Sequence, residues 1–505
     1  MQIAPGPWCN PWYLPDSYRG AALPLATSPT THPYALLPSW LLVLLYVTYR
    51  LYRVVGRRDA VRGSDGLAVL MLAALGIGYM DLDPQLHPWD ERFHALVARN
   101  LAADPLWPRL YRYLELPFDY RGWGGNAVWL HKQPLTLWLQ AATIRLLGAH
   151  TWAVRLPSLL LSLAGVSLTW ALGRRLFGRR TAFVAAFLYA TNGLLLELAS
   201  GRAATDHVDT AFTVAVLAGA YAAVRGRHYA GGRAVAGLCA GLAVLTKWLT
   251  GLLPLALLAV LLPYGWRSVS KLLLPTLLAV AVFLPWQLYI HAAFPAEAGW
   301  EQAYNTRHLF EALEGHAGGW WWHLDRLRRS FGETVFLTLA LAVATARAGD
   351  GRHRWLLVYL GLPLLFFSLA ATKMPAYLAV AYPAVCLLTA RAVMWCATGH
   401  PRLPRRLTGA VAVLLLALPL RYGVERLKPL HAATPAPTAW YAEVAGYAAA
   451  AARTGERVVV FGDPDYVSTM FYFPEVVSYP FPLTAGRRAY LGARAYQIVV
   501  RQTGR

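Results

Sequence analysis

Charged residues are scarce in this chain of 505 residues. They make up 14% of it, against roughly 25% of an ordinary soluble domain, while hydrophobic residues make up 57%. Cysteine is also rare: Cys9, Cys239, Cys386 and Cys396 show no metal-ligand spacing, and three of them lie in or beside apolar runs. The composition therefore excludes an ordinary soluble domain, and the cysteines are expected to pack as small residues rather than form a disulfide framework.

Long apolar runs make up much of the chain. They recur between residues 38 and 420 and are about 15 to 22 residues long, the length that crosses a hydrocarbon core of about 30 Å. The runs are continuously apolar rather than alternating, which predicts helices and not a transmembrane β-barrel. The chain is therefore expected to be an all-α polytopic membrane protein.

Positive charge dominates the few charged residues, with 47 lysines and arginines against 26 acidic residues and a net charge of +21. In a soluble protein this excess would indicate nucleic acid. Here it gathers in short loops between apolar runs, so we interpret it as a topology signal with lipid headgroup contact and expect no nucleic-acid partner. The basic loops are 50–62, 173–180, 225–233, 264–271, 347–354 and 397–406.

About twelve spans place all six basic loops on one side, which is expected to be the cytoplasm. The spans are predicted near 36–49, 66–80, 155–172, 182–198, 210–224, 234–246, 251–263, 272–291, 331–346, 355–371, 376–396 and 407–420. The other side then receives both termini and the connections at 81–154, 199–209, 247–250, 292–330 and 372–375. Within the first of these, helices at about 91–103 and 134–147 are expected to lie along the membrane face.

The composition changes after residue 420. A helix over 440–453 and strand-like runs at 457–461 and 496–500 predict a small external α/β domain. We therefore divide the chain into 1–64 (external segment, extra span and basic loop), 65–420 (the main transmembrane domain) and 421–505 (the small domain). The N-terminus has no basic segment before its first apolar run, so no cleavable signal is expected.

Carboxylates stand out among the external residues. Asp90 and Glu91 lie where the chain leaves the membrane, a costly place for charge unless it does chemistry there. Asp206 and Asp209 are three residues apart, so on a helix they would repel unless a cation or a shared proton lay between them. The ordinary alternative is that Asp90 and Asp206 cap the helices that follow them.

Lys132, Lys247 and Lys373 fall in the same external connections, on the side that the positive-inside rule leaves poor in lysine. The alternative for Lys247 and Lys373 is that they are snorkelling interfacial lysines, while Lys132 opens the surface helix at 134–147. Other polar candidates for substrate binding are Arg92, His131, His207, Arg307, His308, His316 and Tyr377. The histidines lack the close ligand spacing of a zinc site, so no metal is expected.

Lysines beside carboxylates at a bilayer surface are suited to binding and reacting with a substrate that carries a lipid-anchored phosphate. A lysine 4 Å from a phosphate oxygen gains about 4 kcal/mol at an effective dielectric of 20, before desolvation is subtracted. A carboxylate can take a proton from an incoming hydroxyl, which typically contributes about 10²–10⁴-fold in rate. The combination fits glycosyl transfer with a phosphate leaving group.

Several segments, in their order along 66–396, resemble the polytopic GT-C glycosyltransferases, specifically the bacterial aminoarabinose transferases and protein O-mannosyltransferases. The resemblance rests on Asp90-Glu91, Lys132-Gln133-Pro134-Leu135, Arg155-Leu156-Pro157-Ser158, Gly173-Arg174-Arg175-Leu176-Phe177-Gly178, the Asp206-containing loop, Leu245-Thr246-Lys247, Glu314-Gly315-His316 and Thr372-Lys373-Met374-Pro375-Ala376-Tyr377. Three features depart from the family pattern: Arg92 and Phe93 follow the acidic pair directly, the second loop carries two aspartates, and an extra span precedes the core.

The resemblance implies a GT-C fold with residues 65–420 as the catalytic domain. It implies a polyprenyl-phosphate sugar donor, a lipid, glycan or protein acceptor, no cofactor, and transfer at the periplasmic face of a bacterial inner membrane. Asp90 would be the principal catalytic carboxylate, joined by Glu91 and by Asp206 or Asp209, and Lys132 would bind the donor phosphate.

Two other functions stay open at this point. A transporter or flippase of lipid-linked sugar predicts charges near mid-bilayer, where each costs about 2.5–3.5 kcal/mol, and internal repeats. The sequence shows almost no such charges and no repeat. A non-catalytic assembly partner would use residues 433–505 for docking.

Overall fold

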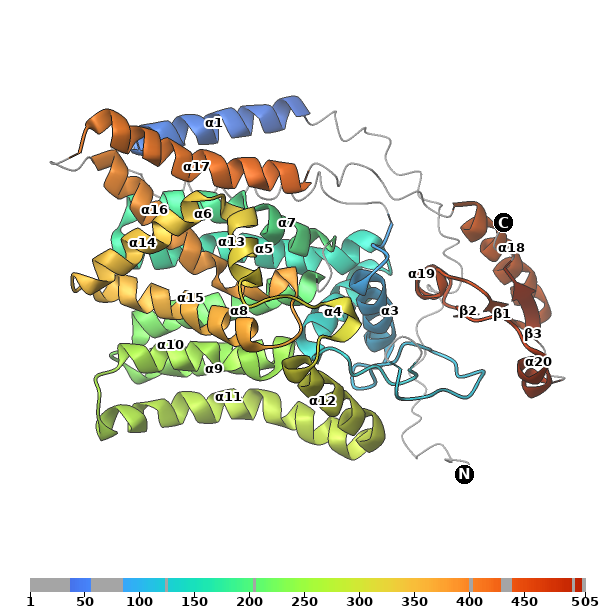
Figure 1. The fold of residues 1–505 in the computed structure, drawn as a ribbon. Coiled ribbons are helices and arrows are strands. Elements are labelled where there is room, and N and C mark those ends of the chain that lie inside the picture. Colours follow the sequence, from blue (N-terminus) through green and yellow to red (C-terminus); the bar gives the residue numbers. More distant parts are fainter. Residues whose placement is uncertain are drawn as a thin grey trace.

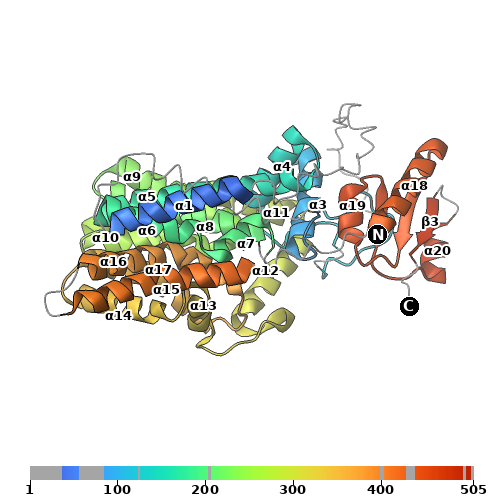
Figure 2. The same ribbon diagram turned by 90° about the horizontal axis from the view of Figure 1, so that it is seen from above.

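The computed structural model describes residues 37–55, 85–122, 126–202, 206–398, 403–427, 438–492 and 496–501. These form a body of roughly parallel helices and a small α/β domain at one end of it (Figures 1 and 2). The span expected at 66–80 and the N-terminal segment before residue 37 lie outside the described residues.

Within the described part of the chain, six helical stretches are long and apolar enough to cross a bilayer. The bent pair of α6 (Arg179–Ala190) and α7 (Gly193–Ser200), which turns by 54°, makes a seventh when its two helices are counted as one span. The six stretches lie in α5 (Thr151–Phe177), α8 (Asp206–Gly226), α9 (Ala230–Lys247) with η3 (Trp248–Leu252) and α10 (Leu253–Leu261), α11 (Trp266–Ala293), η5 (Pro375–Ala381) with α16 (Tyr382–Thr398), and α17 (Arg405–Leu427). Their composition and arrangement make the chain a multi-pass membrane protein.

Three further apolar helices complete the body: α1 (Leu37–Val55), α14 (Thr334–Arg347) and α15 (Gly351–Leu369). Together these helices cover the predicted spans except the one at 66–80. The total of about twelve spans therefore stays a prediction.

The chain doubles back between α9 and α10, as the two expected spans on either side of 247–250 require. Trp248 adopts a positive φ of 53°. A Cβ on Gly251 would lie 2.2 Å from the backbone nitrogen of Val244. In a straight helix residues seven apart are separated by about 10 Å, so the backbone must reverse here, and only glycine allows this close approach.

Three of the expected cytoplasmic loops line one cavity at one end of the helical body, and a fourth, through Lys271, lines a cavity beside it. Arg175 and Leu176 from the end of α5, Arg227 from the end of α8, Leu261 from α10 and Arg352 from α15 line one cavity. These four loops therefore lie at one end of the body, as arginine counting predicted for them.

At the other end, the long connection between residues 85 and 150 carries the two expected helices, α3 (Asp90–Ala103) and α4 (Pro134–Leu147). Connection 292–330 adds α12 (Pro295–Phe310), η4 (Leu313–Gly315) and α13 (Trp322–Phe331). Of these, α3, α4 and α12 lie at the end of the helical body next to the C-terminal domain, where the candidate site lies (Figure 1).

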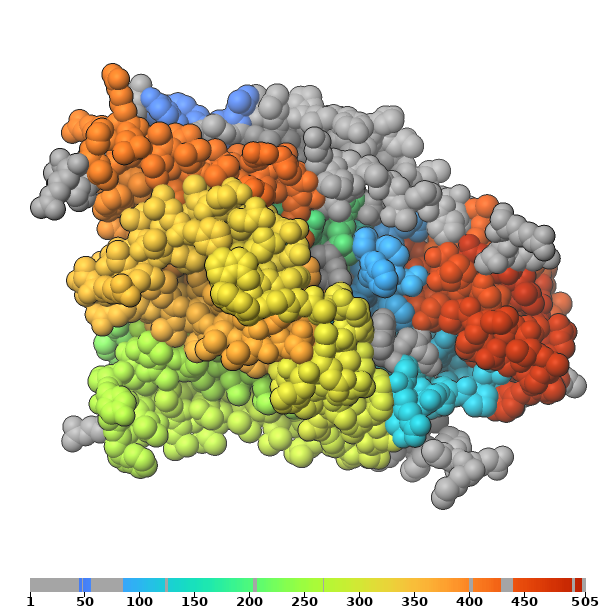
Figure 3. All heavy atoms as spheres, viewed as in Figure 1, coloured from blue at the N-terminus to red at the C-terminus, as the bar shows by residue number. Residues whose placement is uncertain are grey.

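The C-terminal domain is a parallel three-stranded sheet in the order β2-β1-β3. Its elements are α18 (Thr438–Thr454), β1 (Arg457–Phe461), α19 (Tyr466–Tyr472), β2 (Val476–Tyr479), α20 (Ala485–Leu491) and β3 (Tyr496–Val500). The expected helix and both expected strands are confirmed; β2 and the two short helices were not predicted. Figure 3 shows this domain against α3 at the end of the helical body.

One hydrophobic cluster joins that domain to α3 and α4, because Phe93, Leu96 and Leu137 are buried together with Phe461 and Phe471. A larger cluster fills the helical body and contains Cys386 and Cys396. These two cysteines pack as small buried residues, as expected; Cys239 is half-buried, and Cys9 lies outside the described residues.

Candidate active site

Asp90 and Lys132 form an ion pair at the mouth of the site. Lys132 Nζ lies 3.5 Å from Asp90 Oδ2, and each side chain keeps about a fifth of its surface exposed, 18% and 19%. Asp90 is the first residue of α3, and the N-cap position belongs to Trp89, which makes no capping bond. Asp90 is therefore not the cap, and the positive end of the α3 dipole favours its charge.

Asp209 and Lys247 form a second carboxylate–lysine pair, between α8 and the last residue of α9. Asp209 is buried, whereas Lys247 keeps 19% of its side chain exposed. The Lys247 ammonium also lies over the ring of Tyr377, 4.6 Å from its centroid. Lys247 therefore neutralises the charge of the buried Asp209.

The two pairs adjoin each other. Lys247 lies close enough to Lys132 and Asp90 to interact with both electrostatically. Asp90 and Asp209 likewise interact with the phenol of Tyr377. The convergence predicted for these five residues is therefore present, although they come from α3, the loop before α4, α8, α9 and η5.

Glu91 lies behind Asp90 and is completely enclosed. Arg155 donates from Nε and Nη2 to its two oxygens at 2.6 and 2.9 Å, and the backbone nitrogen of His87 donates at 2.6 Å. Burial alone would raise the pKa of Glu91, but Arg155 and His207 outweigh it and lower the pKa to about 2. Glu91 is therefore a permanent anion with no surface open to substrate.

His207 belongs to the same buried network. Its Nε2 lies 3.2 Å from Glu91 Oε1, and its Nδ1 lies 2.6 Å from the hydroxyl oxygen of Ser158. Gly201 closes the network with a φ of +80°, and a Cβ there would lie 2.3 Å from Glu91 Oε1. Glu91 and His207 were predicted to act on substrate, but the structure places them in the layer that supports Asp90.

Two histidines of the prediction line the wall formed by α12. His131 Nδ1 lies 3.0 Å from the buried carboxylate of Glu301, and His308 Nδ1 lies 3.1 Å from the hydroxyl of Thr372. The ring of Tyr304 lies beside both, 6.2 Å from His131 and 5.4 Å from His308 between centroids. This wall therefore presents imidazole and phenol groups next to Lys132.

His308 lies near enough to Lys132 for the two groups to interact electrostatically. Burial lowers the pKa of His308, Glu314 opposes this, and the charges of His131 and Lys132 lower it further. Tyr304 donates a hydrogen bond of 2.8 Å to Glu314, a residue that the sequence analysis noted only as part of a motif. The lowered pKa favours the neutral form of His308 beside Lys132.

Lys373 is not presented to the site. Its ammonium donates to the backbone oxygens of Phe367 (3.0 Å), Ser368 (2.6 Å) and Ala370, and its side chain is buried. These carbonyls end α15, where the helix dipole favours a cation. The prediction that Lys373 binds a phosphate is therefore not supported by its position, because its three donors are already used.

Arg92 and Arg307 also point elsewhere. Arg92 Nη1 donates to the backbone oxygen of Pro464 in the C-terminal domain at 3.4 Å. Arg307 is half exposed and pairs with Glu311 along α12 at 2.7 Å. The half-buried His316 contributes its backbone oxygen to Lys373 N at 2.8 Å. The side chain of Asp206, at the start of α8, lies outside the described structure, so Asp209 is the second-loop carboxylate seen here.

Sequence reasoning gave no role to Arg155, Ser158 and Gly201, which hold the network under Asp90. Arg155 and Ser158 belong to a motif of the family resemblance, but their partners Glu91 and His207 lie 64 and 49 positions away, which leaves no local signal. Among the residues that the structure describes, no group of three His, Cys, Asp or Glu side chains could hold a metal ion.

The chain is similar in sequence to known glycosyltransferases. A family model described as dolichyl-phosphate-mannose-protein mannosyltransferase matches residues 131–289. An undecaprenyl phosphate-alpha-4-amino-4-deoxy-L-arabinose arabinosyl transferase of Pseudomonas paraeruginosa is 30% identical over 59% of this chain and 56% of its own length. One of Pseudomonas fluorescens is 31% identical over 51% and 47%. The chain thus spans about half the length of these relatives.

Solved structures extend the likeness to nearly the whole chain. ArnT from Cupriavidus metallidurans bound to undecaprenyl phosphate superimposes with a TM-score of 0.61 and 17% identity, over 85% of this chain and 88% of that one. Its apo state gives 0.59 and 18% over the same shares. The chain has a GT-C fold.

The archaeal oligosaccharyltransferase AglB of Archaeoglobus fulgidus, solved with an inhibitory peptide and a dolichol-phosphate, is more distant, with a TM-score of 0.50 and 12% identity over 82% of this chain and 64% of that one. The GT-C fold expected from the sequence resemblance is confirmed. In this GT-C chain the two carboxylate–lysine pairs lie where α3 and the loop before α4 meet the ends of α8 and α9.

Proposed function

We propose that this chain is a membrane glycosyltransferase that moves a sugar from a polyprenyl-phosphate carrier to a lipid, glycan or protein acceptor. The observation that carries the proposal is the meeting of Asp90–Lys132 and Asp209–Lys247 at one end of the helical body. The names of the relatives support it, because they are transferases of an undecaprenyl-phosphate-linked sugar.

Lys132 and Lys247 are the groups suited to the donor phosphate. Each keeps about a fifth of its side chain exposed, and they are near enough to act on one anion. Both are already paired with a carboxylate, so a phosphate would join a charged pair rather than meet a bare cation. Its negative charge grows as the bond to the sugar breaks, and two ammonium groups stabilise that growth more than the ground state.

Asp90 is the base in this scheme. An acceptor hydroxyl forms its bond to the anomeric carbon, the bond from that carbon to the phosphate oxygen breaks with its electrons leaving on the phosphate, and the hydroxyl proton passes to Asp90. Asp90 is exposed enough to reach an acceptor, whereas Asp209 is buried against Lys247. Asp209 therefore holds Lys247 in place, and Glu91, Arg155 and His207 hold the start of α3.

The site would face the periplasm of a bacterial inner membrane. Four basic loops line the two cavities at the opposite end of the helices, and short basic loops stay in the cytoplasm. The relatives are bacterial proteins, which favours that membrane. The proposed domains are residues 1–64, 65–420 and 421–505, and 65–420 would be the catalytic domain.

A transporter of lipid-linked sugar is less well supported. Its coupling charges would be expected near the middle of the bilayer. The charged pairs described here lie instead at the first residue of α3, near the start of α8 and at the last residue of α9.

Turnover of a lipid-linked donor tests the proposal. Purified protein would be reconstituted with undecaprenyl-phosphate-linked aminoarabinose or mannose and a lipid or peptide acceptor, and the release of free undecaprenyl phosphate would be measured. We expect Asp90→Asn to remove most of the turnover and Asp119→Asn, the same change at an exposed loop residue, to leave it intact. Equal turnover in the two variants would remove Asp90 from the mechanism, and donor translocation without sugar release would establish a transporter.

A further inference from the structure

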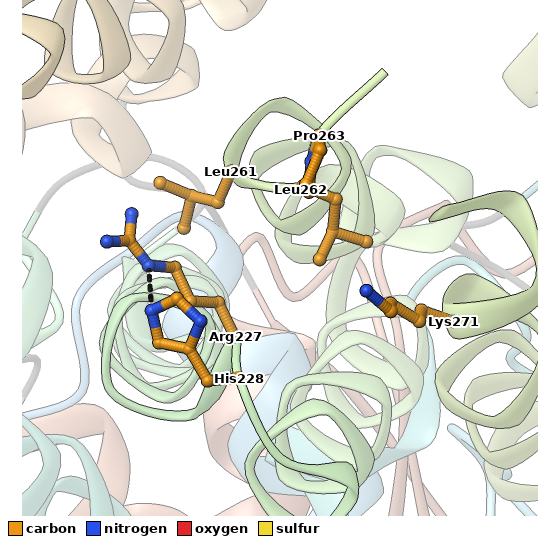
Figure 4. Close-up of a pocket in the computed structure, with 6 residues that line it drawn as sticks. All are labelled: Arg227, His228, Leu261, Leu262, Pro263 and Lys271. Atoms are coloured by element: carbon orange, nitrogen blue, oxygen red, sulfur yellow. Dashed lines mark hydrogen bonds between the residues drawn. The ribbon is translucent and has the colours of Figure 1, made fainter. Parts of the chain in front are cut away.

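A basic pocket lies at the end of the helical body that is farthest from Asp90. It encloses about 360 Å³ and is lined by Arg227, His228, Leu261, Leu262, Pro263 and Lys271. Figure 4 shows Arg227 and His228 on one side and Lys271 reaching in from α11 on the other, with the leucines between them. Nothing in the proposed reaction uses these residues.

The length of α8 separates this pocket from the candidate active site. Asp209 and Arg227 are eighteen residues apart along and just beyond that helix, which corresponds to about 27 Å at 1.5 Å per residue. This is close to the thickness of a hydrocarbon core. The pocket therefore belongs to the opposite membrane face and cannot be part of the donor site.

Positive charge is nearly uncompensated within the four loops around the pocket. The four loops 173–180, 225–233, 264–271 and 347–354 contain twelve lysines and arginines and one acidic residue, Asp350. Asp350 is occupied by Arg352, with two oxygens of the carboxylate bound by the guanidinium. The charges of Arg227 and Lys271 thus have no carboxylate in these loops left to neutralise them.

A second cavity adjoins the first. It encloses about 290 Å³, and it shares Arg227 and Leu261 with the first while adding Arg175 and Arg352. Arg227 donates from Nε to His228 at 2.8 Å, which orients its guanidinium between the two cavities. Two neighbouring spaces, each with an arginine or lysine of its own and one arginine in common, suit a ligand with more than one anionic group.

The surroundings of the pocket are those of a lipid headgroup. Tyr264 and Trp266 stand almost fully exposed in the adjoining turn, as aromatic residues do at the membrane–water boundary. Beyond Lys271 the outer surface of α11 continues with the exposed side chains of Leu273, Leu274 and Leu277. An acyl chain could lie on these leucines while its phosphate reached Lys271 and Arg227.

We propose that this pocket binds the phosphate headgroup of an anionic glycerophospholipid from the leaflet opposite the active site. Basic pockets between transmembrane helices on the cytoplasmic side are suited to such headgroups, and a lipid with two phosphates would fill both cavities. Arg227 and Lys271 make the main ionic contacts, and Arg175 and Arg352 extend the site. The proposal stands apart from sugar transfer.

Lipid retention by the intact protein tests this site. The full chain, purified in detergent, would be titrated with cardiolipin, phosphatidylglycerol or phosphatidylcholine, and bound lipid would be counted by native mass spectrometry. We expect cardiolipin to bind best and phosphatidylcholine worst. We expect the double variant Arg227→Gln with Lys271→Gln to weaken cardiolipin binding roughly tenfold or more.

The matched control is Arg405→Gln with Arg406→Gln. It removes the same charge from the start of α17, which lies at the edge of the body opposite α11 (Figure 1). If both double variants lost the same amount of cardiolipin binding, the loss would be due to net charge alone, and the proposed site would be overturned. The site would also be overturned if the wild type bound phosphatidylcholine as well as it binds cardiolipin.

Competition with inorganic phosphate distinguishes a lipid ligand of the pocket from a soluble anion. Millimolar phosphate that displaces cardiolipin from the wild type, and raises its unfolding temperature as much as the lipid does, would assign the pocket to a free anion instead. The single variant Lys271→Gln guards against misfolding, because Lys271 is exposed. It must weaken cardiolipin binding at an unchanged unfolding temperature in lipid-free detergent, and unchanged binding would also overturn the proposal.

Discussion

Arg155 donates hydrogen bonds to both carboxylate oxygens of Glu91, the residue directly after Asp90, and both side chains are completely buried. The pair joins the first turn of α3 to the second turn of α5, so it fixes the end of the helix from which Asp90 projects. Removing one partner of a buried pair leaves the other charge without compensation, which costs more than the pair itself contributes.

We therefore expect Glu91→Gln to destabilise the protein by about 3–5 kcal/mol, because the Arg155 charge would be left buried. The unfolding temperature in detergent measures the effect. Glu311→Gln is the control, since Glu311 pairs with Arg307 on the exposed face of α12 and should leave the unfolding temperature unchanged. Equal shifts for the two variants would show that the buried pair does not hold α3.

The pH dependence of stability should carry the signature of Glu91. Its folded-state pKa of about 2 lies below the ordinary value of 4.5, so its contribution is fully present above pH 4.5. It is lost as the pH falls from 4.5 toward 2, because the unfolded state takes up the proton first. Unfolding midpoints measured between pH 6 and pH 3 should fall less steeply for Glu91→Gln than for the wild type, and parallel curves would contradict this.

Gly201 should be intolerant of any side chain. Its φ of +80° disfavours other residues by about 1–2 kcal/mol, and a Cβ would also press on the Glu91 carboxylate. We expect Gly201→Ala to lower both the unfolding temperature and the turnover. Gly299→Ala in α12 meets open space and serves as the control. Wild-type turnover in Gly201→Ala would mean that Asp90 does not depend on this layer.

Local signals in the sequence account for what could be predicted. Apolar length located the helices, and arginine in short loops located the end of the body at which those loops meet. Both signals are properties of a continuous segment, so neighbours in space add little to them. The C-terminal domain was predicted less completely, because α19, β2 and α20 are only 4 to 7 residues long and carry weak periodicity.

Partners of individual charged residues could not be predicted, because a pairing depends on how helices pack. Lys247 and Lys373 each follow a threonine at the end of an apolar run, yet one pairs with Asp209 and the other caps the carbonyls of α15. Asp90 and Glu91 are neighbours in sequence, but successive residues of a helix point about 100° apart. One therefore reaches the mouth of the site and the other the buried layer.

The three lysines should separate into two classes when each is changed to glutamine. Lys132→Gln and Lys247→Gln remove a charge suited to the donor phosphate, so we expect kcat/KM for the lipid donor to fall about tenfold or more. Lys373→Gln removes a cap from α15, so we expect a lower unfolding temperature with an unchanged KM. Donor titrations and unfolding curves on the same preparations measure both properties. If Lys373→Gln raised KM as much as Lys247→Gln at an unchanged unfolding temperature, Lys373 would belong to the phosphate site after all, and its bonds to the α15 carbonyls would have to break when the donor binds.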